Sequence, residues 1–307
     1  MRFAKGHGTG NDFVILVDPG DDQGLSADLA ARLCDRRAGI GADGVLRAVR
    51  TDALAGGAAP AAAGPGSDPA AAPNGSAVRS PAAPVPEWYM DYRNSDGSPA
   101  EMCGNGIRVF ARYLADRGLA TRPAFTVATR SGFRRVRFED DGSITAEMGA
   151  VTVLGPGRVV VGGAGGVTCE GLRISVGNPH LACLVDAAMA GFDLARPPQL
   201  DPAQFPHGGN VELVRVTGPG AAEMRVHERG SGETRSCGTG AVAAAAAAAT
   251  AAGQDHGSWQ VSVPGGQLTV TLEPGAAWLG GPAVIVAEGE LDDAWLAAAI
   301  VGTRRPA

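Results

Sequence analysis

Two cysteines stand in matching glycine-rich settings, each immediately before a segment of helix-forming residues. Cys237 belongs to the run Ser-Cys-Gly-Thr-Gly at 236–240, which leads into an alanine-rich stretch, and Cys103 belongs to Met-Cys-Gly-Asn-Gly at 102–106. A helix that begins after such a turn leaves its first backbone N–H groups without partners inside the helix. These groups and the positive end of the helix dipole lower the pKa of a thiol and bind a carboxylate. Each stretch therefore has the chemistry of a thiolate beside an anion site.

The distance between the two cysteines, 237 − 103 = 134 positions, is repeated by other residues. The same offset aligns Gly104 with Gly238, and the register holds without a gap from residue 90 to residue 139. This pattern predicts an internal duplication. A duplicated thiol suits inversion of a carbon stereocentre, because that reaction needs a base on one face of the carbon and an acid on the other. Each sulfur would then act as thiolate in one direction and as thiol in reverse.

The other cysteines lack this context. A lone cysteine before an apolar segment is more often a small buried residue of the core. We expect that role for Cys34, Cys169 and Cys183, which lie in apolar or strand-like surroundings with no Gly-x-Gly after them. The cysteines are dispersed, with no Cys-x-x-Cys pair and no histidine cluster at ligand spacing, so we expect free thiols and no metal site.

The composition limits the partners of the chain. With 307 residues, 45% of them hydrophobic, it is long enough for two domains of ordinary size. A net charge of −6 without a basic cluster argues against a nucleic-acid partner and favours a small-molecule substrate. Residues 1–20 lack the pattern of a signal peptide, and no apolar run reaches the length of about 18 residues that spans a bilayer. We therefore expect no membrane partner and a cytoplasmic location.

The single lysine bears on the cofactor. Lys5 lies at the edge of the first predicted strand, which disfavours a Schiff base with pyridoxal phosphate. The glycine-rich run at 6–10 lacks the Lys-Ser/Thr pair of a phosphate loop and the spacing of a dinucleotide site, so we interpret it as a flexible turn. We expect chemistry without a cofactor.

The periodicity of apolar residues predicts a mixed α/β (α+β) fold. We expect helices at 25–34, at 107–116, over the alanine run and at 291–300. Expected strands lie at 2–5, 13–17, 45–49, 88–92, 125–127, 133–138 and 144–148, and again at 172–176, 181–185, 211–216, 223–227, 260–263, 267–272 and 283–286. Because the alanine helix is small on every side, it suits burial inside a strongly curved sheet. The duplication predicts two pseudo-symmetric domains, 1–147 and 148–284, each a curved mixed sheet around a central helix, with 285–307 packing back on the first half.

Residues 51–86 differ in character from the rest of the chain. Proline recurs there among alanine, glycine and serine, with almost no large apolar residue to pack. The similar strand exits at Asn11 and Asn178 are 178 − 11 = 167 positions apart, so the first half carries 167 − 134 = 33 extra residues. We interpret 51–86 as a disordered insertion.

Several motifs taken together resemble the diaminopimelate epimerase family over nearly the whole chain outside the insertion. They are Phe-Ala-Lys-Gly-His-Gly-Thr-Gly-Asn-Asp-Phe at 3–13, Asn-Ser-Asp-Gly-Ser at 94–98, Met-Cys-Gly-Asn-Gly-Ile-Arg at 102–108, Gly-Asn-Pro-His at 177–180, Asn-Val-Glu at 210–212 and Glu-Arg-Gly-Ser-Gly-Glu-Thr at 228–234. The resemblance implies cofactor-independent conversion of L,L- to meso-diaminopimelate by two thiols, in lysine and cell-wall precursor synthesis. It also implies an active site in the cleft between two domains.

The resemblance assigns roles to individual residues. Cys103 and Cys237 match the acid/base pair, and His180 and Glu228 match the polar residues that adjust the thiols. The carboxylate cradles match Gly104, Asn105, Gly238 and Thr239, and further substrate contacts match Asn11, Asn94, Asn178, Asn210, Glu228 and Arg229. A guanidinium such as Arg229 is suited to bidentate capture of the distal carboxylate. Gly44 departs from the pattern, because some members carry a glutamine there that contacts substrate.

The residues themselves leave other readings open. Isolated asparagines at strand ends are usually turn formers, and a lone histidine at a strand end is usually bonded to backbone. An amino-acid binding module would use the same carboxylate cradles, but it has no use for two matched thiols. A cysteine hydrolase needs one nucleophile, which leaves the duplication unexplained. A proline racemase-like or related isomerase is the alternative within the same chemistry. The oligomeric state is open, with a homodimer as one option.

Overall fold

The computed structural model describes residues 1–54, 84–163 and 165–301. Most of the segment interpreted as an insertion, 55–83, lies outside the described residues, so that interpretation stays a prediction. The contacts divide the chain into two compact units. The first contains Met1–Gly8, the described residues from Asp12 to Ile144 and the segment that begins at Ala283. The second contains Thr9–Asn11 and Thr145–Pro282. Of the helices described, none is both long and apolar enough to span a membrane.

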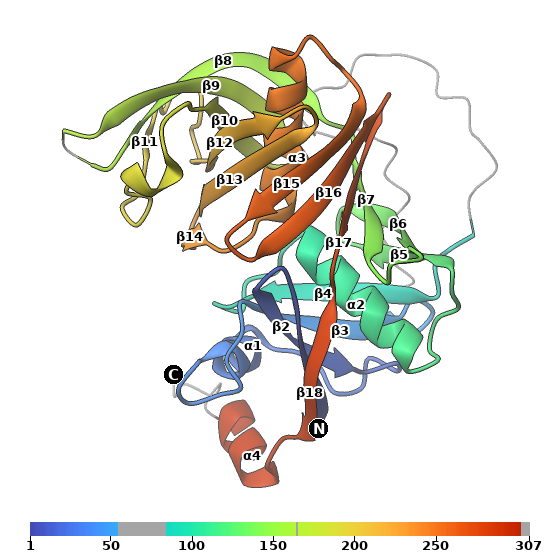
Figure 1. Ribbon diagram of the computed structural model, residues 1–307. Helices are drawn as coiled ribbons and strands as arrows, with labels where there is room; N and C mark the ends of the chain where they lie inside the picture. The colour runs from blue at the N-terminus through green and yellow to red at the C-terminus, as the bar shows by residue number, and fades with distance from the viewer. Residues whose placement is uncertain (55–83, 164, 302–307) are drawn as a thin grey trace, which may run out of the picture. The chain divides into compact units, whose positions relative to one another are not determined.

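The first unit is a mixed sheet with a helix packed against it (Figure 1). Its elements are β1 (Arg2–Gly8), β2 (Asn11–Val17), α1 (Ala27–Cys34), β3 (Gly44–Arg50), β4 (Trp88–Asn94), α2 (Gly104–Asp116), β5 (Ala124–Thr129), β6 (Gly132–Phe138), β18 (Val284–Glu290) and α4 (Asp293–Val301). Strands β1 and β18 are antiparallel, β2 is parallel to β3, β3 is antiparallel to β4, and β4 is parallel to β5. Helix α2 contacts β1, β3, β4 and β18, while α1 packs against α4.

The second unit repeats this plan on a larger scale (Figure 1). Its elements are β7 (Ile144–Gly149), β8 (Thr152–Val161), β9 (Val167–Ser175), β10 (Pro179–Leu184), the 3₁₀ turn Met189–Gly191, β11 (Gln199–Leu200), β12 (Asn210–Gly218), β13 (Ala221–Glu228), β14 (Gly232–Thr234), α3 (Gly238–Ala251), β15 (Gly257–Val263), β16 (Gly266–Glu273) and β17 (Ala276–Gly281). Helix α3 contacts β9, β10, β12, β13, β15, β16 and β17. The sheet therefore surrounds the helix.

The composition of each central helix explains its surroundings. Helix α2 is amphipathic, with Ile107, Phe110 and Leu114 fully buried on one stripe, and it ends at Gly118, whose φ of +67° suits glycine. Helix α3 is buried on every side from Gly240 to Ala249. Small side chains let strands approach a helix closely from all directions, so the alanine run permits the enclosing sheet. The prediction that this helix lies inside a curved sheet is confirmed.

The strand registers of the two units correspond, with a difference of one residue in one strand pair. Trp88 pairs with Val127 in the first unit, and the positions 134 further on, Ala222 and Val261, pair in the second. On the other side of the insertion, Ile15 pairs with Leu46, and Ala182 pairs with Glu212. The offset from Ile15 to Ala182 is 182 − 15 = 167, the value found at the strand exits, whereas the offset from Leu46 to Glu212 is 212 − 46 = 166. The duplication in the sequence is thus also a duplication of sheet register.

The mixed α/β fold class is confirmed, but some elements were not predicted. Strands β8, β11, β14 and β17 are absent from the expected pattern, because they are short, exposed or rich in glycine and proline. The interpretation of residues 6–10 as a flexible turn is partly wrong, because β1 extends to Gly8. A Cβ at Gly6 would lie 2.8 Å from the Val284 carbonyl oxygen and 2.9 Å from Val109 Cγ1. Glycine is needed here because β18 and α2 approach the strand closely, and the turn itself is confined to Thr9 and Gly10.

A buried ionic cluster joins β3, β4 and the turn between β5 and β6 in the first unit. Asp91 on β4 is 1% exposed and accepts hydrogen bonds from Arg47 at 3.1 and 3.2 Å, from Arg93 at 3.0 Å and from Arg130. Burial opposes ionisation of this carboxyl, but the bonds and charges of Arg130 and Arg93 outweigh it and hold the pKa of Asp91 below its usual value. Arg130 also donates to the carbonyl oxygens of Tyr92 and Ala100. The cluster therefore fixes the loop that leads to Cys103.

Candidate active site

Cys103 and Cys237 each form the N-cap of a central helix. The Cys103 backbone has φ −135° and ψ 122°, and the Cys237 backbone has φ −119° and ψ 121°. In both units the sulfur accepts a hydrogen bond of 3.4 Å from the backbone N–H three residues later, at Gly106 and Gly240. The prediction that both cysteines lie at helix N-termini is confirmed. The two helices thus present a sulfur in the same local geometry.

The glycines at the third helical position are required by close packing. A Cβ at Gly106 would lie 3.2 Å from Leu46 Cδ2 and 3.3 Å from Cys103 Cβ. A Cβ at Gly240 would lie 2.8 Å from Glu212 Oε1 and 3.3 Å from Cys237 Sγ. Contacts below 3.0 Å force a neighbour to move, so Gly240 leaves space that Glu212 occupies.

Cys237 lies among polar groups although it is only 5% exposed. Its sulfur is 3.5 Å from Thr239 Oγ1. Burial and the neighbouring carboxylates of Glu228 and Glu212 raise the pKa of the Cys237 thiol well above its usual value. Burial also raises the pKa of Glu228, against hydrogen bonds from Thr234 and Cys237 that favour its ionised form.

A buried hydrogen-bonded chain extends away from this thiol. His180 and Glu212 are both fully buried, and His180 Nδ1 lies 2.7 Å from Glu212 Oε1. The other ring nitrogen, Nε2, lies 2.9 Å from Asn178 Oδ1, and Asn178 Nδ2 lies 3.4 Å from Thr239 Oγ1. The structure therefore brings Asn178, His180, Glu212 and Thr239 together in one network. Glu212 was not among the predicted site residues, although a glutamate within the apolar strand at 210–214 was the signal for it.

Cys103 has different neighbours. Asn105 is fully buried, and its Oδ1 accepts a hydrogen bond of 2.9 Å from Arg108 Nη2. Arg108 is also fully buried, and its Nη1 donates to the Gly104 carbonyl oxygen at 3.1 Å. Burial lowers the pKa of Arg108 to about 10, and the charge of Cys103 opposes this. Arg108 was likewise not predicted, because an arginine on a helix is usually exposed.

The turns that precede each helix are held by their own side chains. Asn94 Nδ2 donates to Ser98 Oγ at 3.0 Å, so this asparagine braces the turn before Cys103. Asn11 lies at the start of β2, in the Thr9–Asn11 segment that belongs to the second unit. There Thr9 Oγ1 lies 2.7 Å from Ser236 Oγ, next to Cys237. The predicted flexible turn is therefore docked on the Cys237 loop.

Arg229 lines a cavity of the second unit, and Asn210 holds the backbone at this arginine. The Asn210 Oδ1 accepts a hydrogen bond of 2.9 Å from the Arg229 backbone N–H, which fixes the chain before the arginine side chain. Arg229 Nη1 donates to the His207 carbonyl oxygen at 3.3 Å. The cavity has a volume of about 470 Å³ and is lined by Arg229 together with Phe205, Gly208 and several prolines. An exposed guanidinium at a cavity is available to an anion.

Gly44 has no room for a side chain. A Cβ there would lie 2.5 Å from the Arg93 carbonyl oxygen and 2.7 Å from the Tyr92 ring. A glutamine at this position would therefore require movement of β4.

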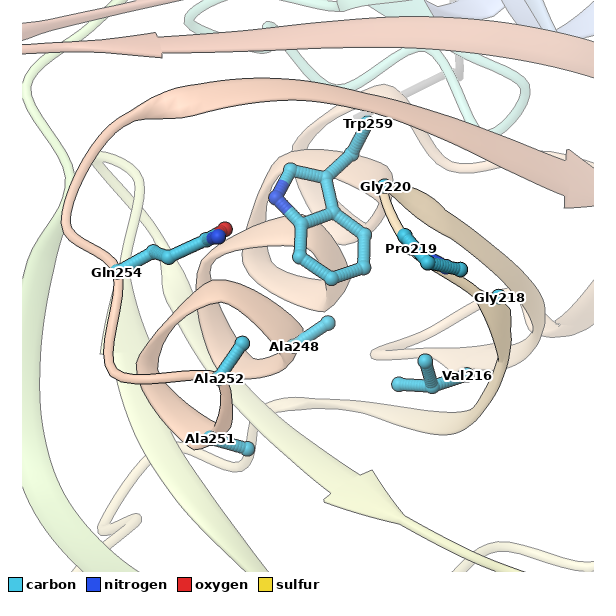
Figure 2. Close-up of a pocket in the computed structure, with 9 residues that line it drawn as sticks. All are labelled: Val216, Gly218, Pro219, Gly220, Ala248, Ala251, Ala252, Gln254 and Trp259. Carbon is cyan, nitrogen blue, oxygen red and sulfur yellow. The ribbon is translucent and has the colours of Figure 1, made fainter.

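A second cavity of the second unit lies at the opposite end of α3 from Cys237. It has a volume of about 440 Å³ and is lined by Val216, Pro219, Ala248, Ala252 and Trp259, among others (Figure 2). These residues surround the C-terminal end of α3, whereas Cys237 caps its N-terminal end. A helix of 14 residues is about 20 Å long. This apolar cavity is therefore separate from the Cys237 site. In the described parts of the chain, His, Cys, Asp and Glu form no group of three or more that could hold a metal ion.

Comparison with solved structures identifies the class of the fold. A probable proline racemase from Agrobacterium radiobacter K84 superposes with a TM-score of 0.62, covering 95% of this chain and 93% of that chain at 13% sequence identity. At this identity the similarity concerns the fold alone. The fold is thus shared with proteins described as racemases and epimerases.

Comparison of sequences identifies the family. The sequence model of the family described as Diaminopimelate epimerase matches residues 3–154 and 172–291. The diaminopimelate epimerase of Thermobifida fusca (strain YX) is 56% identical over 291 residues, which cover 95% of this chain and 98% of that protein. That of Rhodococcus opacus (strain B4) is 50% identical over 303 residues, covering 96% and 98% respectively. The chain belongs to the diaminopimelate epimerase family. It is therefore an enzyme of the isomerase class with a small-molecule substrate, as the sequence predicted.

Proposed function

We propose that the chain interconverts L,L- and meso-diaminopimelate by proton transfer between two thiols at the α-carbon. The observation that carries the proposal is the pair of helix N-caps, in which Cys103 and Cys237 have the same backbone conformation and the same bond from the third helical N–H. One thiolate removes the α-proton, and the opposite thiol delivers a proton to the other face.

The backbone after each cysteine is proposed to hold the carboxylate beside the reacting carbon. The N–H groups of Gly104 and Asn105, and of Gly238 and Thr239, occupy the first two positions of their helices, where no intrahelical acceptor exists. Removal of the α-proton places negative charge on this carboxylate. Helix N-termini aimed at the developing charge stabilise it more than they stabilise the substrate, which accelerates the reaction.

The proposal is tested by incubating the protein with L,L-diaminopimelate and separating the stereoisomers by chiral chromatography. We expect approach to an equilibrium of the L,L and meso forms without an added cofactor. Turnover of proline in place of diaminopimelate would favour the proline racemase-like alternative, which now rests only on similarity of fold. Binding of diaminopimelate with no exchange of its α-proton would contradict catalysis and favour a binding module.

Arg229 is proposed to bind the distal carboxylate of the substrate. Replacing it with methionine should raise KM about 10–100-fold, because a hydrogen bond to a charged group contributes about 1.5–3 kcal/mol. The change in kcat should be smaller, since this contact is remote from the reacting carbon. Steady-state kinetics of Arg229→Met measures both constants. The matched control is Arg215→Met, which removes an arginine paired with Glu223 elsewhere in the unit. A KM equal to that of the wild type would exclude this role for Arg229.

Gly240 is predicted to be intolerant of a methyl group. Alanine normally stabilises a helix interior by about 0.5–1 kcal/mol relative to glycine. Here the added Cβ meets Glu212 Oε1 and Cys237 Sγ, so kcat should fall about 100-fold, the size expected for displacement of a catalytic group by about 1 Å. Gly191→Ala is the control, because nothing lies within 4 Å of its Cβ position. Normal kcat in Gly240→Ala would mean that the thiol tolerates displacement.

The cellular setting is part of the proposal. Two free catalytic thiols require a reducing compartment, which supports a cytoplasmic location. Cell fractionation tests this. A homodimer also stays a prediction, and sedimentation analysis that returns the mass of a single chain would contradict it.

A further inference from the structure

The backbone around Cys103 in the first unit has the same conformation as that around Cys237 in the second, but the charged side chains near the two cysteines have opposite sign. At two equivalent strand positions the first unit has an apolar residue and the second unit has a polar one. At one equivalent position of the central helices the first unit has a charged residue and the second unit has an apolar one. The equivalent pairs are Phe13 and His180, Leu46 and Glu212, and Arg108 and Val242. Asn94 of the first unit likewise corresponds to Glu228 of the second, at the offset of 228 − 94 = 134. The surroundings of Cys103 therefore contain a cation, Arg108, that has no counterpart near Cys237. The surroundings of Cys237 contain two carboxyl groups, those of Glu212 and Glu228, that have no counterpart near Cys103.

Arg108 is a buried cation without a counter-ion. It is fully buried, and its hydrogen bonds go to the neutral oxygens of Gly104 and Asn105, while Nε has no partner. Within the described residues, no carboxylate lies at ion-pair distance from it. A Cβ at Gly8 would be 3.2 Å from Arg108 Nη2, so the backbone of β1 packs directly against the guanidinium group. An uncompensated buried charge is costly, which calls for a negative partner.

Cys103 caps the helix that carries Arg108, and Arg108 Nη1 donates to the carbonyl oxygen of Gly104, the residue next to Cys103. Cys103 is therefore placed to supply that negative charge. It is the group whose charge favours the protonated guanidinium of Arg108. Coupling between two charges is reciprocal, so the guanidinium favours the Cys103 thiolate to the same extent. Charged side chains on the strands against α2 have other partners: Lys5 pairs with Asp12, Arg47 and Arg93 pair with Asp91, and Glu288 pairs with Arg117. His7 of β1 also lies on these strands.

The surroundings of Cys237 act in the opposite direction. Glu212 Oε1 lies against the helix at Gly240, and Glu228 shares a hydrogen bond with the thiol. Both carboxyl groups disfavour a second negative charge at the sulfur. His180 bonds to Glu212 and offsets part of its charge. The remaining charged groups on the strands around α3 have other partners or are exposed. Ion pairs join Arg215 to Glu223 and Arg225 to Glu233. Hydrogen bonds join Arg173 to carbonyl oxygens, His227 to the Leu194 carbonyl and Glu273 to Trp278, and Glu170 is exposed on β9.

We propose that the free enzyme rests with Cys103 as the thiolate, held by Arg108, and with Cys237 as the thiol, held by Glu212 and Glu228. Arg108 is a positioning residue in this scheme, because it acts through Cys103. The proposal extends the two-thiol function given above. In one turnover the α-proton passes to the Cys103 sulfur, and the Cys237 proton passes to the other face of the carbon. The enzyme is then left with a Cys103 thiol and a Cys237 thiolate. One proton must move from Cys103 to solvent and one from solvent to Cys237 before the resting state returns.

The test follows the pH dependence of alkylation at each cysteine. The full-length protein without substrate reacts with iodoacetamide at a series of pH values, and peptide mass spectrometry gives the rate at Cys103 and Cys237 separately. In a plot of alkylation rate against pH, the accessibility of the cysteine determines the height of the plateau, and the fraction of thiolate determines the midpoint. The midpoint of this curve is therefore the quantity to compare. We expect the Cys103 midpoint below the ordinary thiol value of about 8.5 and the Cys237 midpoint above it. A Cys237 midpoint below that of Cys103 overturns the proposal without any variant.

Variants separate the charge of Arg108 from its packing. Arg108→Met should raise the Cys103 midpoint, with about tenfold slower alkylation at neutral pH for each unit of the shift, and leave Cys237 unchanged. Arg108→Lys keeps the cation and should restore a low midpoint. Glu212→Gln should lower the Cys237 midpoint alone. Circular dichroism confirms that each variant is folded. A Cys103 midpoint that stays the same in folded Arg108→Met contradicts the proposal, and if that variant does not fold, a raised midpoint in Arg108→Lys contradicts it.

These measurements are independent of turnover. If the midpoints differ as expected but diaminopimelate is not epimerised, the charge asymmetry stands and the proposed function fails. If epimerisation occurs with equal midpoints, the proposed function stands and the asymmetry fails.

Discussion

Replacing either Cys103 or Cys237 with alanine should lower kcat for epimerisation by about 10²–10⁴-fold or more, because each variant leaves one face of the α-carbon without a proton carrier. The two losses should not multiply in the double variant, since the thiols act as one unit. Steady-state kinetics with chiral analysis measures the three rates. Cys169→Ala is the control, because Cys169 is buried in the core of the second unit and has no proposed part in catalysis.

Isotope incorporation gives a sharper form of this expectation. Early turnover in D₂O should place deuterium in the epimerised product while recovered substrate stays largely protiated, because a solvent-derived proton arrives from the opposite thiol. A single base would return label to both isomers. Equal initial labelling of substrate and product, or near-normal epimerisation by one Cys→Ala variant, would contradict the two-thiol mechanism.

Replacing Asp91 with asparagine should lower the free energy of unfolding by about 3–5 kcal/mol. Asparagine preserves the shape of the side chain but removes the charge that compensates Arg47, Arg93 and Arg130. Whole domains are stable by only about 5–15 kcal/mol, so this is a large fraction. Urea denaturation followed by circular dichroism measures the difference. Asp255→Asn is the control, since that side chain is 94% exposed, and it should change stability by less than about 0.5 kcal/mol.

The pH dependence of stability provides a second measurement. The pKa of Asp91 is lower in the folded protein than its usual value, so its contribution is fully present above the unfolded value of about 3.9 and is lost as the pH falls through the folded value. Wild-type stability should therefore decrease in this acid range more steeply than that of Asp91→Asn. Parallel decreases in the two proteins would show that the carboxylate is not stabilised by its arginine partners.

The sequence predicted the parts of the fold that repeat. The offset of 134 located both cysteine caps, and the offsets of 134 and 167 predicted the duplication, because duplicated strands keep both pattern and spacing. Strand β8 was missed, since Gly155, Pro156 and Gly157 interrupt its alternation. Strand β17 was missed because its sequence, Ala-Ala-Trp-Leu-Gly-Gly, reads as a turn. Pairing with neighbouring strands decides both, and local sequence does not contain that information.

The site residues that were missed have a common cause. Arg108 and Glu212 look like ordinary charged residues on a helix and a strand, and such residues are usually exposed. Only the fold reveals that both are buried, Arg108 on the helix that Cys103 caps and Glu212 against the first turn of the helix that Cys237 caps. The predicted site residue His180 is part of a larger network that also contains Glu212 and Asn178, whereas Glu228 bonds to Thr234. The roles of these residues in catalysis stay predictions until the variants are measured.

The alanine helix has a consequence for how its own orientation is set. From Ala241 to Ala249 every residue is buried, and Val242 is the one side chain larger than a methyl group. A uniform cylinder of methyl groups fits its surroundings almost equally well at many angles of rotation about its axis. The rotation must therefore be set by Val242 and by bonds from the ends of the helix to other segments, of which the bond from Asn178 Nδ2 to Thr239 Oγ1 is one. The end of the helix that carries Cys237 therefore also sets the rotation of the helix within the surrounding sheet.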